Sequence, residues 1–369
     1  MRAVVIPLVV VVGLGLTACA SEEGGYQEPL AAKTKSVVRA AVDDLETRPV
    51  LEFEGALDEL TGGGESAVIK TEVVETGDAY TTAEIGGHEI KLMTVDGVYY
   101  VSAPEEFWED QGVDSSHAKK IDGEWTQVDP EVWFDLGLLT AEQYAAALEE
   151  AVTDAGVLDT ELPEPADYNG VEAYAIPVGE SGTVYISVAE PHTVLGVEGV
   201  EVTIDNSTLV LDSDVAGIDA EQVEKLLEKL TDAVKDMKEI FDDGADLQLS
   251  EDPSSFTCSN STFTCEHSVS VTASFRGKYL LADKVKLKMK VTMDGGSIGT
   301  KKCDDSATVD LGESASLKCT ATFNPPADGV PYDILSTHTI TGVTTYKPDV
   351  DAITEKLAED FESILGEFG

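Results

Sequence analysis

The stretch Met93-Thr94-Val95-Asp96-Gly97-Val98-Tyr99-Tyr100 decides how the first half of the chain folds. Apolar and Thr residues alternate before Asp96-Gly97, Val and Tyr follow it, and this dipeptide is typical of a two-residue hairpin turn. The stretch therefore predicts two antiparallel strands. The same pattern of Val, Ile, Tyr and Thr between Gly-containing turns predicts strands at 50–58, 67–75, 79–85, 89–95 and 98–102.

Helical spacing of apolar residues appears on both sides of these strands. Residues 29–47 predict an amphipathic helix that Pro49 ends. Residues 130–155 return to helical spacing, with a second helix start at Thr140. The alternating pattern of apolar and polar residues resumes later and predicts strands at 171–178, 183–188, 193–198 and 200–211. The order helix, strands, helices, strands predicts one antiparallel α+β unit, which we place at 29–214.

The second half of the chain begins with a long apolar stripe at helical spacing. Residues 218–242 predict an amphipathic helix with Asp219 as its N-cap, and 215–244 link the two halves. Beyond it, alternating strands are predicted at 256–263, 266–275, 285–293, 307–309, 314–323 and 336–345, and a last helix at 349–368. Strands at this spacing predict a small immunoglobulin-like β-sandwich within 245–369.

Four of the five cysteines lie in this second unit: Cys258, Cys265, Cys303 and Cys319. An even number in an exported domain predicts two disulfides with three possible connectivities. We favour Cys258–Cys265, which closes a hairpin, and Cys303–Cys319. The alternative is a zinc site, which the spacing disfavours because it contains no Cys-x-x-Cys pair.

The N-terminus carries one charge, Arg2, followed by an apolar run over 3–16 that is too short to span a bilayer. It predicts a secretory leader. Its end, Leu16-Thr17-Ala18-Cys19, resembles the bacterial lipobox. The resemblance implies a signal peptide at 1–18, lipid attachment at Cys19, a flexible tether over 19–28, and a place on the extracytoplasmic face of a bacterial cell membrane. The alternative is a secreted protein with a chance cysteine.

Three local phrases resemble one family. The stretch 93–100 followed by Gly123-Glu124-Trp125 and Asp129-Pro130, and then the runs 170–176, 182–188 and 191–195, are similar to actinobacterial lipoproteins with the LolA-like, mycobacterial lipoprotein-carrier fold. The resemblance implies an antiparallel half-barrel with inserted helices and a cavity for a lipid or lipoprotein ligand. The lining residues would be Leu92 and Tyr100 from one strand face, with Trp133, Phe134, Leu139 and Tyr144 from the helices. The alternative for each of them is an ordinary core position.

The charge of the chain is strongly negative: 71 Asp and Glu against 24 Lys and Arg give −47. Such a surface argues against binding to nucleic acid or to a bare anionic bilayer, so we expect the membrane to be reached only through the anchor. Residues 121–214 hold 21 acidic residues and no basic ones, which serves solubility or, alternatively, collects cations.

One local exception to this charge is the row Lys286, Lys288 and Lys290, which alternation places on one strand face. The row could contact an anionic envelope polymer or the acidic surface of the partner domain. The alternative is a solvated strand, or an edge strand that its lysines protect against aggregation.

Catalytic motifs are weak. The run 295–299 fits Gly-x-Ser-x-Gly, but a turn and not a helix follows it, and the five histidines are scattered along the chain. We therefore expect no catalytic residues, no metal and no cofactor. The sequence favours a non-enzymatic, membrane-anchored lipoprotein that binds a lipid in its first unit. The alternative is a structural or adhesive envelope protein that acts through its second unit.

Overall fold

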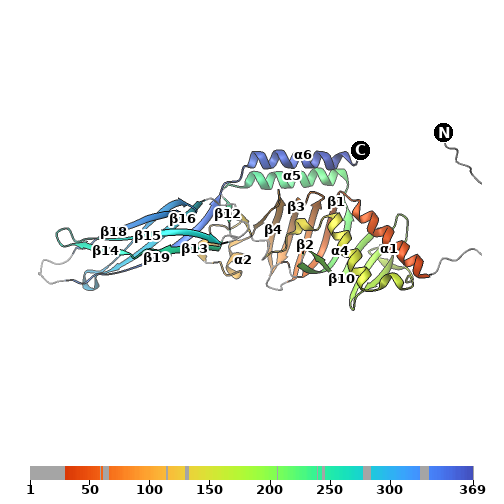
Figure 1. The fold of residues 1–369 in the computed structure, drawn as a ribbon, viewed down its shortest axis with the longest axis horizontal. Helices are drawn as coiled ribbons and strands as arrows, with labels where there is room; N and C mark the ends of the chain where they lie inside the picture. Colours follow the sequence, from red (N-terminus) through yellow and green to blue (C-terminus); the bar gives the residue numbers. More distant parts are fainter. Residues whose placement is uncertain are drawn as a thin grey trace, which may run out of the picture.

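The structure is a computed structural model that describes residues 30–58, 60, 66–113, 115–128, 133–205, 207–238, 240–242, 246–276, 284–324 and 332–368. The expected signal peptide, tether and Cys19 lie outside these residues. Most of the described chain is sheet with a few helices, so the α+β class is confirmed. The molecule is elongated (Figure 1). Helices α1 (Leu30–Glu46) and α4 (Ala141–Asp154) lie near one end, and the strands from β13 (Asp246–Glu251) to β19 (Leu335–Tyr346) lie at the other.

The first strands form an antiparallel meander at nearly the predicted positions. They are β1 (Val50–Asp58), β2 (Ser66–Val74), β3 (Ala79–Ile85), β4 (His88–Val95) and β5 (Val98–Ser102). Val95 pairs with Val98 around the predicted turn. Asp96 and Gly97 both have positive φ, 53° and 72°, which matches the twist that a two-residue hairpin requires.

A second antiparallel series extends the same sheet. It comprises β7 (Ala166–Tyr168), β8 (Val171–Val178), β9 (Gly182–Ser187), β10 (Val194–Ile204) and β11 (Ser207–Gly217), and β11 pairs with β1. The predicted break between 198 and 200 is wrong, because β10 continues through a bulge between Val197 and Val200. Gly199 absorbs the bulge with a φ of 56°, and its N–H donates to Asp212.

Two helices cover one face of this sheet: α1 (Leu30–Glu46) and α4 (Ala141–Asp154). Thr140 caps α4 by accepting from the N–H of Gln143, as the sequence predicts. The helical spacing that begins at 130 does not give a longer helix. Residues Leu136–Leu138 form a 3-10 turn (η1), because the Asp135 carboxylate accepts from the N–H of Gly137. The sequence did not predict two short helices, α2 (Glu105–Asp110) and α3 (Ser115–Ala118).

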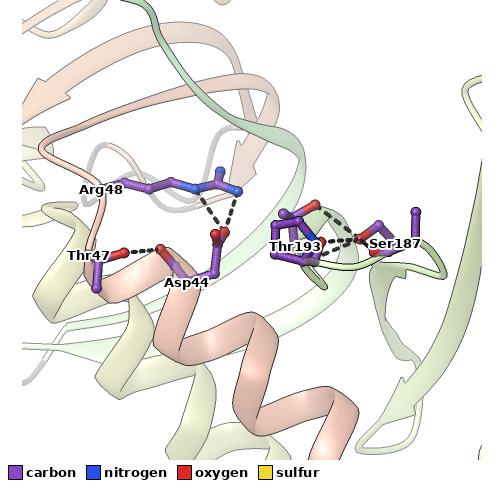
Figure 2. A network of polar contacts seen from close by, with 7 residues as sticks. Asp44, Thr47, Arg48, Ser187 and Thr193 are labelled. Carbon is purple, nitrogen blue, oxygen red and sulfur yellow. Dashed lines mark hydrogen bonds and ion pairs between the residues drawn. The ribbon is translucent and has the colours of Figure 1, made fainter. Parts of the chain in front are cut away.

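Two polar networks hold the ends of elements on this side of the molecule, and Figure 2 shows both. After α1, Arg48 forms an ion pair of 2.7 Å with Asp44, and the Thr47 hydroxyl donates to the Asp44 carbonyl. Between β9 and β10, the Thr193 N–H donates to the Ser187 hydroxyl over 2.8 Å. These bonds fix where α1 and the loop after β9 end.

The opposite face of the sheet carries α5 (Ala220–Asp236) and α6 (Val350–Gly366), which lie side by side (Figure 1). A capping box of Asp219 and Gln222 begins α5. The prediction that this helix continues to 242 is wrong. Residues Ile240–Asp242 form β12, which pairs parallel with β6 (Trp125–Gln127) and antiparallel with β19 (Leu335–Tyr346). The free edge of β6 offers this segment backbone partners, and these override its helical pattern.

The C-terminal strands form two sheets that share one apolar core. One sheet holds β13 (Asp246–Glu251), β14 (Ser255–Ser259), β15 (Thr264–Arg276) and β18 (Ser314–Thr322). The other holds β16 (Lys284–Asp294), β17 (Thr300–Asp310) and β19, which β12 joins to the long sheet. Both predicted disulfides are confirmed: Cys258–Cys265 links β14 to β15, and Cys303–Cys319 links β17 to β18. The immunoglobulin-like assignment and the domain boundaries stay predictions.

Candidate functional site

Five of the six predicted ligand-binding residues lie together under α1 and α4. They are Leu92, Trp133, Phe134, Leu139 and Tyr144, all buried in one apolar cluster. Trp133 and Phe134 lie ahead of the 3-10 turn and not on a helix. The ring of Tyr144 packs edge-on against Phe53, with 5.0 Å between centroids. These side chains pack against one another as a core, and none of them lines the pocket described below.

The sixth residue, Tyr100, lies on the opposite face of the sheet, and the prediction that it shares a face with Leu92 is wrong. In the register of β4 and β5, Tyr100 pairs with Met93, whereas Leu92 pairs with Val101. Paired residues share a face, so an offset of one residue places Tyr100 on the side of α5 and α6. Its hydroxyl accepts a hydrogen bond of 2.8 Å from Tyr346 of β19. Tyr100 thus joins the two halves of the molecule.

A pocket of about 640 Å³ opens beside this core, between α4 and strands β8 to β11. Its helix wall is built from small side chains one turn apart, Ala147, Ala151 and Ala155. Val178, Gly182, Gly199, Thr203 and Val210 form its sheet wall, with Gly179 and Ser181 at the turn between β8 and β9. The alanines of this helix face leave space that larger side chains would fill, whereas Gly182 and Gly199 allow the backbones of β9 and β10 to approach each other closely.

The rim of the pocket is acidic. Glu150 and Asp154 come from α4, Glu180 from the turn after β8, and Glu201 from β10. The pocket is half open, and its lining combines small apolar side chains with a slightly larger polar surface. Carboxylates in such a lining repel an anionic head group. This pocket was not predicted from the sequence. The signal that could have indicated it is the alanine at every fourth position, 147, 151 and 155, which predicts a narrow helix face.

Two tyrosine hydroxyls are buried in the neighbouring core without a hydrogen-bond partner among the described residues: Tyr99 and Tyr144. Burial raises the pKa of Tyr144 far above its ordinary value. Burial, together with the nearby Asp135 carboxylate, raises the pKa of Tyr99. An unpartnered buried hydroxyl costs stability, about 1–3 kcal/mol. The core under α4 is therefore not packed for maximum stability.

Tyr144→Phe is expected to raise the free energy of unfolding by about 1 kcal/mol, because it removes an unpaired hydroxyl and keeps the ring against Phe53. Denaturant unfolding of the two proteins measures the change. Tyr168→Phe is the matched control. It should lower the free energy of unfolding, since the Tyr168 hydroxyl donates a hydrogen bond of 2.6 Å to Asp214. A Tyr144→Phe protein that is less stable than wild type would contradict the expectation.

A separate group of polar side chains links the two C-terminal sheets. Nε2 of His267 lies 2.9 Å from Nδ1 of His338, and Nε2 of His338 lies 2.9 Å from Glu251. The Ser336 hydroxyl lies 2.9 Å from Nδ1 of His267. Burial, and then the neighbouring His338, lower the pKa of His267. Scattered in the sequence, these two histidines meet in space and tie β15 to β19.

No group of three or more His, Cys, Asp or Glu side chains within the described ranges is arranged to hold a metal ion. No helix among the described residues is long and apolar enough to cross a membrane. Fold and site together define an α+β protein with a helix-covered sheet, a pocket beside it and a disulfide-bonded β unit.

Comparison with known proteins adds distant structural likeness only. No family model and no curated protein matches the sequence. Among solved structures, the chain is similar to LprF from Mycobacterium bovis, with a TM-score of 0.32 and 10% identity over 51% of this chain and 94% of that chain. It is also similar to MucB in complex with MucA(peri), with a TM-score of 0.23 and 13% identity over 88% and 97% of the two chains. Likeness at these TM-scores carries no argument, so the LolA-like half-barrel stays a prediction.

Proposed function

We propose that this protein is a non-enzymatic, extracytoplasmic lipoprotein, anchored through Cys19, that binds an amphipathic ligand in the pocket between α4 and strands β8 to β11. The observation that carries the proposal is this pocket of about 640 Å³ with small side chains on its walls. Its volume lies within the range of small-molecule sites, roughly 300–1,000 Å³. The pocket lies beside the closed apolar core, so a bound ligand would contact the surface of the core and would not enter it.

The ligand that fits these walls has an apolar chain and a neutral or cationic polar end. Transfer of the chain from water to Ala147, Ala151 and Val178 is favourable, at about 25 cal/mol per Å² of buried apolar surface. The carboxyl groups of Glu150, Asp154, Glu180 and Glu201 belong to the pocket lining and would repel a phosphate or carboxylate head group. A lipid or lipid-like molecule of this charge type is the ligand class that the pocket favours.

The anchor follows from the lipobox resemblance and from the charge of the chain. With −47 charges the protein is repelled by anionic head groups, so electrostatic attraction does not hold it at a membrane. Acyl chains do, since each buried CH₂ contributes roughly 0.8 kcal/mol and two chains anchor stably. The tether of 19–28 would then place the first unit close to the bilayer.

Native mass spectrometry and lipidomics of a Cys19→Ala protein, purified without detergent, test the ligand. We expect a co-purifying amphipathic molecule, and we expect Ala151→Trp to remove it by filling the pocket. Ala146→Trp is the matched control, because Ala146 lies on the exposed face of the same helix. A ligand-free spectrum, or equal ligand content in the two variants, would reject the proposal.

A further inference from the structure

The lysine row of the second unit lies on an interior strand of its sheet. β16 pairs with β17 on one side and with β19 on the other, so the interpretation as an edge strand is wrong. Val285, Leu287, Met289 and Val291 point into the core and are buried. The alternating residues Lys284, Lys286, Lys288 and Lys290 all point outward and are exposed. Protection of a free edge therefore does not explain these four lysines.

Hydroxyl side chains flank the middle of the row. Lys286 pairs with Thr308, and Lys288 pairs with Ser306 and Thr341. Among the described residues that pair with the row, acidic side chains lie only at its ends, where Asp310 pairs with Lys284 and Asp304 with Lys290. The centre of this face thus combines ammonium groups with hydroxyl donors.

The geometry of the row is linear. Alternate residues of a strand lie about 6.6–6.8 Å apart, so the four lysines form a straight line of roughly 20 Å. Ammonium groups at this spacing repel one another, and bound anions would offset that repulsion. A linear anion of matching length would compensate the whole row at once.

The net charge of the chain is distributed unevenly between the unit that carries the lysine row and the rest of the protein. Residues 246–348 hold 12 acidic and 10 basic side chains, whereas the rest of the chain holds 59 acidic and 14 basic ones. The unit that carries the row is therefore almost neutral. It also lies at the end of the molecule far from α1 and β10 (Figure 1).

We propose that the outer face of β16, with the flanking hydroxyls of β17 and β19, binds a linear polymer of phosphate groups. Lysine ammonium groups act as point charges for phosphate, whereas planar carboxylates are recognised best by the two-pronged guanidinium of arginine, and the row contains only lysine. Thr308, Ser306 and Thr341 would donate hydrogen bonds to phosphate oxygens. This surface is independent of the pocket beside α4.

Titration of fluorescently labelled long-chain inorganic polyphosphate into the Cys19→Ala protein tests the proposal. We expect saturable binding that weakens from 50 to 200 mM salt, because binding releases counterions from the polymer. Lys286→Gln with Lys288→Gln should weaken binding at least tenfold and make it less salt-dependent. Both side chains are exposed, so the thermal unfolding of this variant should match wild type.

The matched control is Lys33→Gln with Lys35→Gln, which removes two exposed lysines of α1 and should change affinity less than twofold. Equal weakening in both double variants, or the absence of saturable binding, would overturn the proposal. Equal affinity for polygalacturonate would overturn the assignment to phosphate. Self-association through the row, without polyphosphate binding, would make the acidic surface of a second copy the partner and overturn it too.

Discussion

Phe361→Ala is expected to lower the free energy of unfolding of the first half of the molecule by about 3–5 kcal/mol, the range for removal of a fully buried aromatic ring. Phe361 is 0% exposed and lies in α6, at the end of the chain. Its apolar cluster also contains Leu230 of α5 and Val95 of β4. Loss of the ring leaves a cavity between two helices and the sheet, so β4, more than 260 positions away in sequence, loses stability.

Denaturant unfolding, followed by amide exchange in β4 and β5, measures this effect. Phe368→Ala is the matched control: Phe368 follows the same helix but is 39% exposed, so its loss should change the free energy by less than about 0.5 kcal/mol. Equal effects of the two substitutions would show that α6 does not pack on the sheet. A deletion of 245–369 would also remove α6, and it is therefore expected to destabilise the first unit.

The second large effect is expected at Cys303–Cys319. Replacing both cysteines with alanine should lower the free energy of unfolding of the C-terminal unit by about 3 kcal/mol, since the bond closes a loop of sequence separation 16. The bond also connects β17 and β18, which belong to different sheets. Its loss leaves these two strands without a covalent link across the core. Denaturant unfolding with and without reductant measures the change.

Cys258–Cys265 provides the comparison within the same unit. It joins residues that already pair in the hairpin of β14 and β15, at a sequence separation of 7, so its removal should cost less. If removal of Cys258–Cys265 lowers the free energy of unfolding as much as removal of Cys303–Cys319, or more, the link between the sheets is not the more stabilising disulfide.

Local sequence determined most strands of the protein and the class of its fold. The turn at Asp96-Gly97 needs positive φ at both positions, and this requirement is satisfied within four residues. Alternation over β1 to β5 and the cap at Asp219 are equally local, so their positions could be predicted. The two disulfides were predictable as well, because four cysteines allow few pairings.

Features that depend on contacts between distant residues were decided by the tertiary structure. The face of Tyr100 depends on its register with Met93, and a shift of one residue reverses it. The change of 240–242 from helix to strand depends on the free edge of β6. Alanine spacing on α4 marks a narrow helix face, but only the approach of β8 to β11 makes it a pocket.

The lysine row also combines a feature that local sequence determines with one that only the tertiary structure decides. Alternation alone placed Lys286, Lys288 and Lys290 on one face, because side chains along a strand alternate between its two sides. Whether that face belonged to an edge or to the interior of a sheet depended on β17 and β19, which pair with β16 from later parts of the chain. Sequence thus determines which side chains share a face, and tertiary pairing determines what that face meets.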